Sequence, residues 1–446
     1  MTNRLLPLLR VAFYQLRGGF LVRPLLICVA LGVLGAAVSS LEESFPALSA
    51  WVPNVLFPSR ADPQVAQIVL ATIAASIMTV VSIVFALLLM SLTLASMQFS
   101  PRILLSFVKD RVTQWTLGIF LGTFAFCIAA LPTAHSRPHP FAPIATVTCA
   151  MALALACLAW LIFFVNHISQ AISVNHMVDR IARETEQVID ETMPDARRHR
   201  YEQQDVPFEN NGNEARVDCA ISGYIRYIDA ARLLHLAKAF KVRVRVLHRV
   251  GHFVPAGVAL FVASPAERLD HGRAGELRSV FDIGPTRTMQ QDVEFGVIQI
   301  VDIALKALSP AVNDPSTAIT CVDQLGRIMI RFVNRHAPVS LLCEPPHVVR
   351  VIIPWILSEG LLDTAFEQIR HYSMSDIAVS LRLLRVFDNI ASSCRERRVV
   401  ESLVVRGQRI LAGCTVRVSP DQLEKLRQRV STLEARLQPL SSANGT

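Results

Sequence analysis

Residues 68–97 read IVLATIAASIMTVVSIVFALLLMSLTLASM, and the uncharged run that contains them extends from Pro63 to Pro101. No Asp, Glu, Lys, Arg or His occurs between Asp62 and Arg102. A helix needs roughly 20 apolar residues to cross a bilayer, so this run is more than long enough. The sequence therefore predicts a transmembrane helix that either tilts strongly or continues past the membrane surface.

The composition of the chain indicates a membrane protein with a soluble part. Of its 446 residues, 52% are hydrophobic and only 18% are charged, whereas soluble domains contain about 25% charged residues. The residues before His167 include only nine of the 44 Lys and Arg and four of the 36 Asp and Glu. The remainder has the composition of a soluble protein. We attribute the high net charge to membrane orientation, and no nucleic-acid partner is implied.

We expect a membrane all-α fold with four transmembrane helices, followed by a cytosolic α+β region and a C-terminal all-α region. The spans are predicted at residues 24–41, 66–97, 115–131 and 141–165. Residues 1–23 mix leucines and aromatic residues with arginines, which is typical of a helix lying in the membrane interface. A cleaved signal peptide is the alternative for the first hydrophobic segment.

The distribution of Lys and Arg predicts the orientation of the spans. Four arginines precede the first span and three cationic residues lie between the second and the third, whereas the other two loops contain one each. Cytoplasmic loops carry an excess of Lys and Arg. The N-terminus, the second loop and the whole C-terminal part are therefore predicted to be cytoplasmic.

Three regions are predicted beyond the spans. Residues 166–215 read as a helical stalk followed by a polar linker. Residues 216–285 read as a small β-rich module with tight turns at Gly251 and Gly257, and residues 286–440 as a helical domain. The last helix has leucine and valine at alternating three- and four-residue steps. It could dock onto the chain's own helices or mediate self-association.

The long second span has two different faces. At about 100° per residue, one arc carries small and hydroxyl side chains: Thr72, Ala75, Ser76, Thr79, Ser82, Ala86 and Thr93. The opposite side consists of Ile77, Val81, Val84 and Leu88, which we expect to face lipid. We single out Thr72, Ser76, Thr79 and Ser82. They are candidates for close packing between helices or for lining a neutral pore in an oligomer.

The cytoplasmic exit of this span is a second candidate site. It comprises Gln98, Ser100, Pro101 and Arg102. Pro101 disfavours helical geometry at the preceding residue, so the chain is predicted to turn there. Arg102, Lys109 and Arg111 can anchor this turn on lipid headgroups. In an oligomer they can also form a cationic vestibule that enriches anions.

A polar stripe on a later helix is the third candidate. On a helix predicted over residues 289–308, the stripe comprises Asp292, Gln299, Asp302 and Lys306. Asp302 and Lys306 have the i,i+4 spacing of an ion pair. A pair of carboxylates on one face can alternatively serve a metal site or acid–base chemistry.

A turn is predicted after this helix. Its residues are Asn313, Asp314 and Pro315. Ser316 or Thr317 can then cap the following helix, because short side chains with an oxygen atom satisfy the first free N–H groups.

The sequence lacks signatures of catalysis. It has no phosphate loop, HExxH, GxSxG or Gly-rich nucleotide fingerprint, so we expect no enzyme, cofactor or metal. His248 and His252 share one side of a strand-like segment but have no third ligand nearby. The nine cysteines include no CxxC pair, which favours reduced and mostly buried thiols. No ionisable residue lies deep in the predicted spans, which argues against an ion-coupled carrier.

Four motifs carry a resemblance to a known family. They are QFSPR at 98–102, GYIRYID at 223–229, GHFVPAG at 251–257 and DVEFGVIQIVDIALKALSPAVNDPSTA at 292–318. With these motifs the chain resembles, over nearly its whole length, the bacterial membrane-protein family called domain of unknown function 2254. The resemblance implies a bacterial inner-membrane location. It implies no catalytic or ligand-binding residue.

These observations lead to two main functional hypotheses. The first is a channel-like or membrane-sensing protein whose cytosolic domain regulates the spans. Because a four-span unit has little interior for a pathway, we expect a homo-oligomer in the lipid bilayer, with the ion or ligand left open. The alternative is a membrane-anchored interaction or signalling scaffold. An enzyme that uses Asp292 or Asp302 is a third class.

Overall fold

The structure is a computed structural model and describes residues 22–45, 62–98, 110–134, 141–171, 173–193, 213–335, 341–344, 348–414 and 419–437. The chain divides into two compact units, Met1–Ser173 and Val174–Thr446. We call the first the membrane unit and the second the C-terminal unit.

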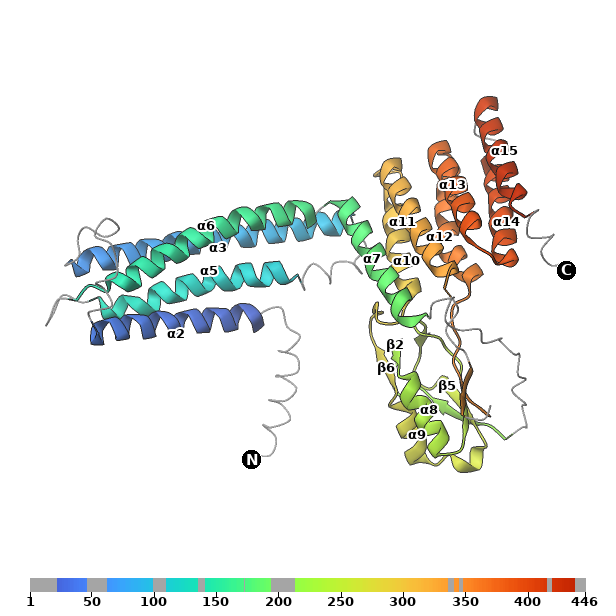
Figure 1. The fold of residues 1–446 in the computed structure, drawn as a ribbon, viewed down its shortest axis with the longest axis horizontal. Helices are drawn as coiled ribbons and strands as arrows, with labels where there is room; N and C mark the ends of the chain where they lie inside the picture. Colours follow the sequence, from blue (N-terminus) through green and yellow to red (C-terminus); the bar gives the residue numbers. More distant parts are fainter. Residues whose placement is uncertain are drawn as a thin grey trace. The chain divides into compact units, whose positions relative to one another are not determined.

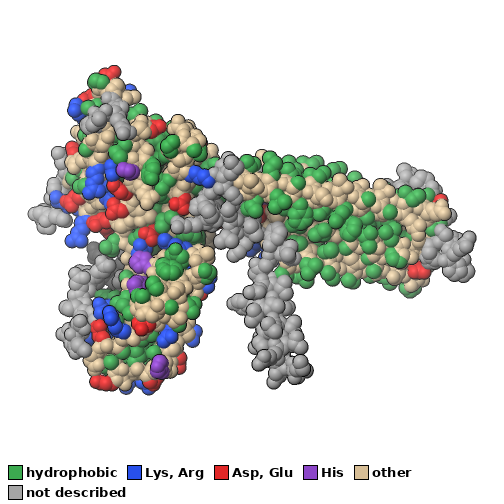
Figure 2. All heavy atoms as spheres, turned by 180° about the vertical axis from the view of Figure 1, so that it is seen from behind, with side chains coloured by type: hydrophobic (Ala, Val, Ile, Leu, Met, Phe, Trp, Pro, Cys, Tyr) green, Lys and Arg blue, Asp and Glu red, His purple; other side chains and the backbone are tan. Residues whose placement is uncertain are grey.

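Four long helices form the membrane unit. They are α2 (Val22–Ser44), α3 (Pro63–Gln98), α5 (Arg111–Ala130) and α6 (Ile144–Ala171), and the short helix η3 (Leu131–Thr133) extends α5 (Figure 1). All four are long and apolar enough to cross a membrane. Figure 2 shows hydrophobic side chains spread along the visible face of this unit. The prediction of a four-helix membrane fold is confirmed.

Glycines bring α2 and α5 into close contact. A Cβ atom added at Gly35 of α2 would lie 2.6 Å from the carbonyl oxygen of Phe126, and one added at Gly118 of α5 would lie 2.7 Å from Ile27 Cδ1. The contacts advance together along both helices, so α2 and α5 run parallel. Small residues at such an interface let two backbones approach, which is how helices associate in lipid.

Helices α3, α5 and α6 share a cluster of buried apolar side chains. Val84 of α3, Phe120 of α5 and Phe164 of α6 are fully buried in one cluster. The start of α3 lies near the end of α5, because the Gln67 side chain donates a hydrogen bond to the carbonyl of Ala134. Dispersion contacts in such a cluster hold the bundle together.

Two sheets form the centre of the C-terminal unit. The strand orders are β1-β5-β3-β8-β7 and β4-β2-β6, and every paired strand is antiparallel except β3 with β8. The strands are β1 (Ala215–Asp218), β2 (Gly223–Ile228), β3 (Arg243–Val246), β4 (Phe253–Val254), β5 (Ala259–Ser264), β6 (Phe281–Gly284), β7 (Leu341–Glu344) and β8 (Val348–Ile352). Between them lie α8 (Ala230–Ala239), η4 (Ala266–Arg268) and α9 (His271–Arg278).

The prediction that residues 286–440 form a helical domain is wrong at β7 and β8. These strands join the larger sheet, where Val351 of β8 pairs with Val244 of β3. Val351 is fully buried there. The β-rich part therefore takes two strands from a distant segment. Such long-range pairing leaves no local periodicity in a sequence beyond a short run of β-branched residues.

Seven helices complete the described part of the C-terminal unit. They are α7 (Val174–Thr192), α10 (Val293–Ala307), α11 (Pro315–Val333), α12 (Ser358–Tyr372), α13 (Ile377–Ser393), α14 (Arg397–Cys414) and α15 (Pro420–Ala435). The apolar side of α15 is buried at Leu426, Val430 and Leu433. It packs against α13 and α14, so the last helix docks onto the chain's own helices.

The helix α7 is part of the C-terminal core. It follows α6 after two intervening residues and packs against α10 and α11. Ile181, Ala182 and Ile189 are buried on its apolar side. The predicted stalk helix therefore packs into the C-terminal core, because other helices cover its apolar side.

Candidate functional site

Four charged side chains meet where α10 begins. Arg249 forms two hydrogen bonds of 3.0 Å with the Glu294 carboxylate. Arg287 binds Asp292 through contacts of 2.7 and 2.8 Å and also reaches Glu294 at 3.0 Å. Paired, multiply hydrogen-bonded contacts of this kind are the strong class of ion pair. We call these four residues the charge cluster.

Local geometry holds the charge cluster together. Asp292 caps α10 by accepting a hydrogen bond of 3.1 Å from the Phe295 N–H, and only 3% of its surface is exposed. Gly251 has a φ of 89° in the turn before β4 and lies against Asp292 and Arg287. A side chain there would clash with both, so this turn requires glycine.

This geometry corrects the predicted polar stripe. The helix begins at Val293 and not at residue 289, because Asp292 is its cap. The other members, Gln299, Asp302 and Lys306, lie further along α10. At about 1.5 Å of rise per residue, Lys306 is about 20 Å from Asp292 along the helix. The stripe is therefore not one site.

The surroundings shift the pKa values of the charge cluster. Burial by itself opposes the charge on Glu294, but hydrogen bonds from Arg249 and Arg287 outweigh burial and lower the pKa of this carboxyl group. His252 lies nearby, and burial followed by the charge of Arg249 lowers its pKa. The Thr364 hydroxyl of α12 donates a further hydrogen bond of 3.1 Å to Glu294. Hydrogen bonds from Arg249, Arg287 and Thr364 thus favour the charged form of Glu294.

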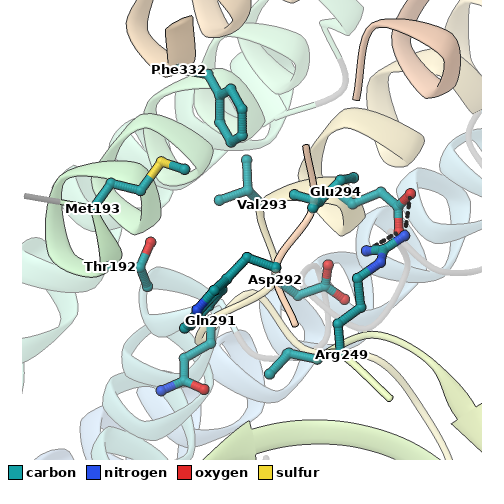
Figure 3. Close-up of a pocket in the computed structure, with 11 residues that line it drawn as sticks. Thr192, Met193, Arg249, Gln291, Asp292, Val293, Glu294 and Phe332 are labelled. Carbon is teal, nitrogen blue, oxygen red and sulfur yellow. Dashed lines mark hydrogen bonds and ion pairs between the residues drawn. The ribbon is translucent and has the colours of Figure 1, made fainter. Parts of the chain in front are cut away.

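A small pocket adjoins the charge cluster (Figure 3). Its walls come from the end of α7, the turn after β3, the start of α10, α11 and the segment before α12. Thr192, Met193 and Phe332 contribute to it together with Arg249 and Glu294. The volume of about 30 Å³ accommodates one or two water molecules, since one water needs roughly 10–15 Å³. Sites for drug-sized ligands are about tenfold larger.

The turn after α10 has a different cap from the predicted one. Asn313 adopts the left-handed conformation with a φ of 49°. Asp314 caps α11, because its carboxylate accepts hydrogen bonds of 3.1 Å from the Thr317 N–H and 2.6 Å from the Thr317 hydroxyl. These hydrogen bonds lower the pKa of Asp314. Ser316 and Thr317 are therefore inside the first helical turn, and the cap is one residue before Pro315.

The candidate face of α3 lies away from the core of its unit. Thr72, Ser76, Thr79 and Ser82 are exposed in the single chain. The hydroxyl groups of Thr72, Thr79 and Ser82 donate to carbonyls four residues earlier on α3. Packing of this face against the chain's own spans is thus excluded for the described residues.

The opposite face of α3 corrects another expectation. Ile77, Val81 and Val84 are buried within the membrane unit, although we expected them to face lipid. Large apolar side chains suit both lipid and a protein core, so hydrophobicity alone did not distinguish these environments. Of the predicted exit, Gln98 is the last residue of α3. Residues 100–102 lie outside the described ranges.

Sequence reasoning missed a buried carboxylate at one end of the membrane unit. Glu42 of α2 is 1% exposed and accepts hydrogen bonds of 2.7 and 2.9 Å from the N–H groups of Ala145 and Thr146. It therefore caps α6, where a helix N-terminus favours a negative charge. The first predicted span ends at residue 41, one residue before this charge. The helix continues past it to Ser44 because the charge has partners inside the unit.

A polar ladder at the other end was also missed. His167 Nε2 of α6 lies 3.0 Å from Asp110 Oδ2, at the start of α5. Seven residues earlier on α6, the Trp160 N–H donates a hydrogen bond of 2.9 Å to the Thr116 hydroxyl of α5. Thr123 and Cys157 follow at 3.3 Å.

The spacing of these residues could have revealed the ladder. Positions 116 and 123 on α5 and positions 160 and 167 on α6 are each seven residues apart, which places each pair on one helix face. Glu42 and His167 lie just beyond the predicted spans and within four residues of the ends of their helices, so they do not contradict the expectation that no ionisable residue lies deep in the spans.

A metal site is not supported among the described residues. His248 and His252 have ring centroids 6.2 Å apart. Within the described ranges no three His, Cys, Asp or Glu side chains are grouped so that they could hold a metal ion. A structural zinc site, for comparison, needs four protein ligands.

Comparison with known proteins agrees with a membrane protein. The chain is 32% identical over 392 residues to an uncharacterized protein of Mycobacterium bovis, covering 85% of this chain and 74% of that protein. An uncharacterized protein of Mycobacterium tuberculosis matches with the same identity and coverage. No solved structure matches the chain. The family described as predicted membrane protein (DUF2254) matches residues 17–389, and this chain belongs to that family.

Proposed function

We propose that the protein is a channel-like or membrane-sensing homo-oligomer of the bacterial inner membrane, with both termini cytoplasmic, in which the C-terminal unit regulates the spans. The observation that carries this proposal is the position of α7. This helix follows α6 after two intervening residues and is embedded among the helices of the C-terminal unit. A displacement of the C-terminal core would therefore act directly on the end of a span.

Two kinds of contact hold α7 in place. Arg327 of α11 lies 3.0 Å from Asp179 of α7, and Arg331 lies 2.6 Å from Asp190. These side chains are 35–47% exposed, and exposed ion pairs contribute about 0–1 kcal/mol each. Ile189 is fully buried, and truncating such a residue to alanine costs about 2–5 kcal/mol. The apolar face therefore dominates, and α7 is firmly attached to the C-terminal core.

The outward face of α3 supports assembly of the membrane unit. It combines small and hydroxyl side chains with no covering helix among the described residues of its own unit. Such a face allows close approach of a second copy or contact with water in a narrow pore. In this proposal Ser76 and Thr79 lie at the contact or on the pathway.

Ion flux and oligomeric state test this proposal. The full chain in liposomes is expected to conduct ions, and Thr79→Leu is expected to change the flux at equal protein density. Met78→Leu is the matched control, because Met78 is an exposed apolar residue of the same helix outside the arc of small side chains. Native mass spectrometry should show an oligomer. A monomer without flux at every lipid composition and membrane tension would contradict the proposal.

A membrane-anchored scaffold is the second candidate. It is favoured by apolar side chains exposed on the C-terminal unit at Ile221, Phe253 and Val258. The two segments that carry them are joined by a hydrogen bond of 2.8 Å from the Cys219 N–H to the Val258 carbonyl. A partner protein that depends on Phe253, together with an absence of flux, would favour the scaffold.

A further inference from the structure

We infer that the Asp110–His167 pair is a proton-binding site, and that protonation of His167 tightens the contact between the end of α6 and the start of α5. This inference goes beyond the proposed function, because it holds whether or not the spans conduct ions. It concerns a contact that joins two helices of the membrane unit.

The geometry is that of a charge-assisted hydrogen bond. His167 Nε2 and Asp110 Oδ2 are 3.0 Å apart, and the two side chains are 29% and 24% exposed. The imidazole ring also stacks on Phe163, with centroids 6.3 Å apart. Both residues are thus held in place, and each keeps about a quarter of its side chain exposed on the surface of the single chain.

Asp110 supplies the fixed negative charge. It caps α5 by accepting hydrogen bonds of 3.0 Å from the Thr113 N–H and 2.9 Å from the Thr113 hydroxyl. Burial by itself opposes the charge, but these hydrogen bonds and the neighbouring His167 outweigh it and lower the pKa of Asp110. The carboxylate therefore stays ionised at neutral pH.

Few other charges lie near the pair among the described residues of the membrane unit. On α5 the next residue is Arg111, which is exposed, and on the parallel helix α2 the same end carries the exposed Arg23. Neither α3 nor the rest of α6 has an ionisable side chain at this end within the described residues. Asp110 is thus the carboxylate that faces His167, and their mutual attraction depends on the proton.

The proton changes the strength of one specific contact. Histidine is the ordinary side chain that gains or loses its charge between about pH 5 and pH 8. Protonation turns a hydrogen bond with one ionised partner into an ion pair, which adds the attraction between two opposite charges 3.0 Å apart. The next contact between the same helices is the hydrogen bond from Trp160 to Thr116. Trp160 therefore lies where a change in the packing of α5 and α6 can be detected.

Tryptophan fluorescence of the full chain in nanodiscs tests the inference. The chain has four tryptophans, and replacing Trp51, Trp115 and Trp355 with phenylalanine leaves Trp160 as the reporter. We expect its emission to undergo a transition between about pH 5 and pH 8. His167→Gln keeps a hydrogen-bond donor but cannot titrate, so the transition should be lost. His176→Gln, in the C-terminal unit, should leave it unchanged.

Asp110→Asn separates the charge from the cap. Asparagine is also a good N-cap, so α5 should remain intact while the transition is lost. A transition that persists in His167→Gln, or is missing in the parent protein, overturns the inference. The melting temperature gives a second readout. If His167→Gln lowers the melting temperature more at low pH than at high pH, the result supports a proton-binding site. An equal lowering at both pH values would show that the contact does not depend on a proton.

Discussion

Acidic side chains at helix N-termini recur throughout the molecule. Glu42 caps α6, Asp110 caps α5, Asp292 caps α10 and Asp314 caps α11. In each case the carboxylate accepts hydrogen bonds from N–H groups that have no partner within the helix, and the helix dipole favours its charge. Only Asp292 is also joined to an arginine cluster, so it links the start of a helix to the β-rich part.

Glu294→Gln tests the charge cluster. We expect it to lower the free energy of unfolding by about 2–3 kcal/mol at neutral pH, because Arg249 and Arg287 lose a shared anion. The folded pKa of Glu294 is lowered. Its contribution is therefore present above the unfolded pKa of about 4.3 and lost as the pH falls through the folded value.

Denaturant unfolding at neutral pH and below about pH 4 measures this difference. The difference in the free energy of unfolding between Glu294→Gln and the parent protein should become smaller in acid. Glu276→Gln is the control, because Glu276 is exposed on α9. A gap that stays constant with pH would show that the charge of Glu294 contributes nothing.

The helices α2 and α3 contact the rest of the membrane unit through opposite kinds of face. The helix α2 approaches α5 through glycines, whereas α3 contacts the bundle through large side chains such as Val84 and leaves its small residues outside. Since lipid does not drive apolar faces together, close fit decides which face is used. A face of small residues that no helix of its own unit covers can be contacted by a second copy of the chain.

Gly35→Ala tests the contact between α2 and α5. The added Cβ would meet the backbone of Phe126 at 2.6 Å, and backbone atoms cannot move aside as a side chain can. We expect a loss of about 1–3 kcal/mol, typical of overpacking, seen as a lower melting temperature in detergent.

The matched control is Gly32→Ala on the same helix. Its Cβ would lie 3.4 Å from Ala125 Cβ, an ordinary contact. This variant should melt at or above the temperature of the parent protein, because alanine favours helices more than glycine. An equal drop in melting temperature in both variants would contradict a close contact between α2 and α5 at Gly35.

At the scale of the whole molecule, two cores belong to two separate units. The candidate spans all lie in the membrane unit. The sheets of the C-terminal unit enclose a core of their own around Val244, Leu233 and Phe261. A unit with its own core is expected to fold alone.

Residues 174–446 should therefore fold when produced without the spans. We expect a soluble fragment with a helical circular dichroism spectrum and a cooperative thermal transition. A fragment from residue 194 lacks α7 and exposes the apolar surface that Ile181 and Ile189 cover, so it should melt at a lower temperature. A fragment from 174 without a cooperative transition would show that its fold depends on the membrane unit.

Local properties of the chain were enough to predict part of this architecture. Hydrophobic length and charge density identified the four spans and the change to soluble composition after His167, because membrane insertion depends on segment composition more than on tertiary contacts. Turn residues near Asn313 and Gly251 were also predictable, since a left-handed backbone restricts the residue type. The polar ladder could have been found from its seven-residue spacing.

Tertiary structure alone decided how these parts meet. The pairing of β8 with β3 joins segments about a hundred residues apart, and no local pattern records such a partner. The buried face of α3 and the partners of Glu42 and Asp292 also follow from packing between distant helices. Apolar side chains suit lipid and core equally, and a carboxylate is stable wherever donors surround it. The sequence therefore predicts the elements, while their contacts select the faces and the sites.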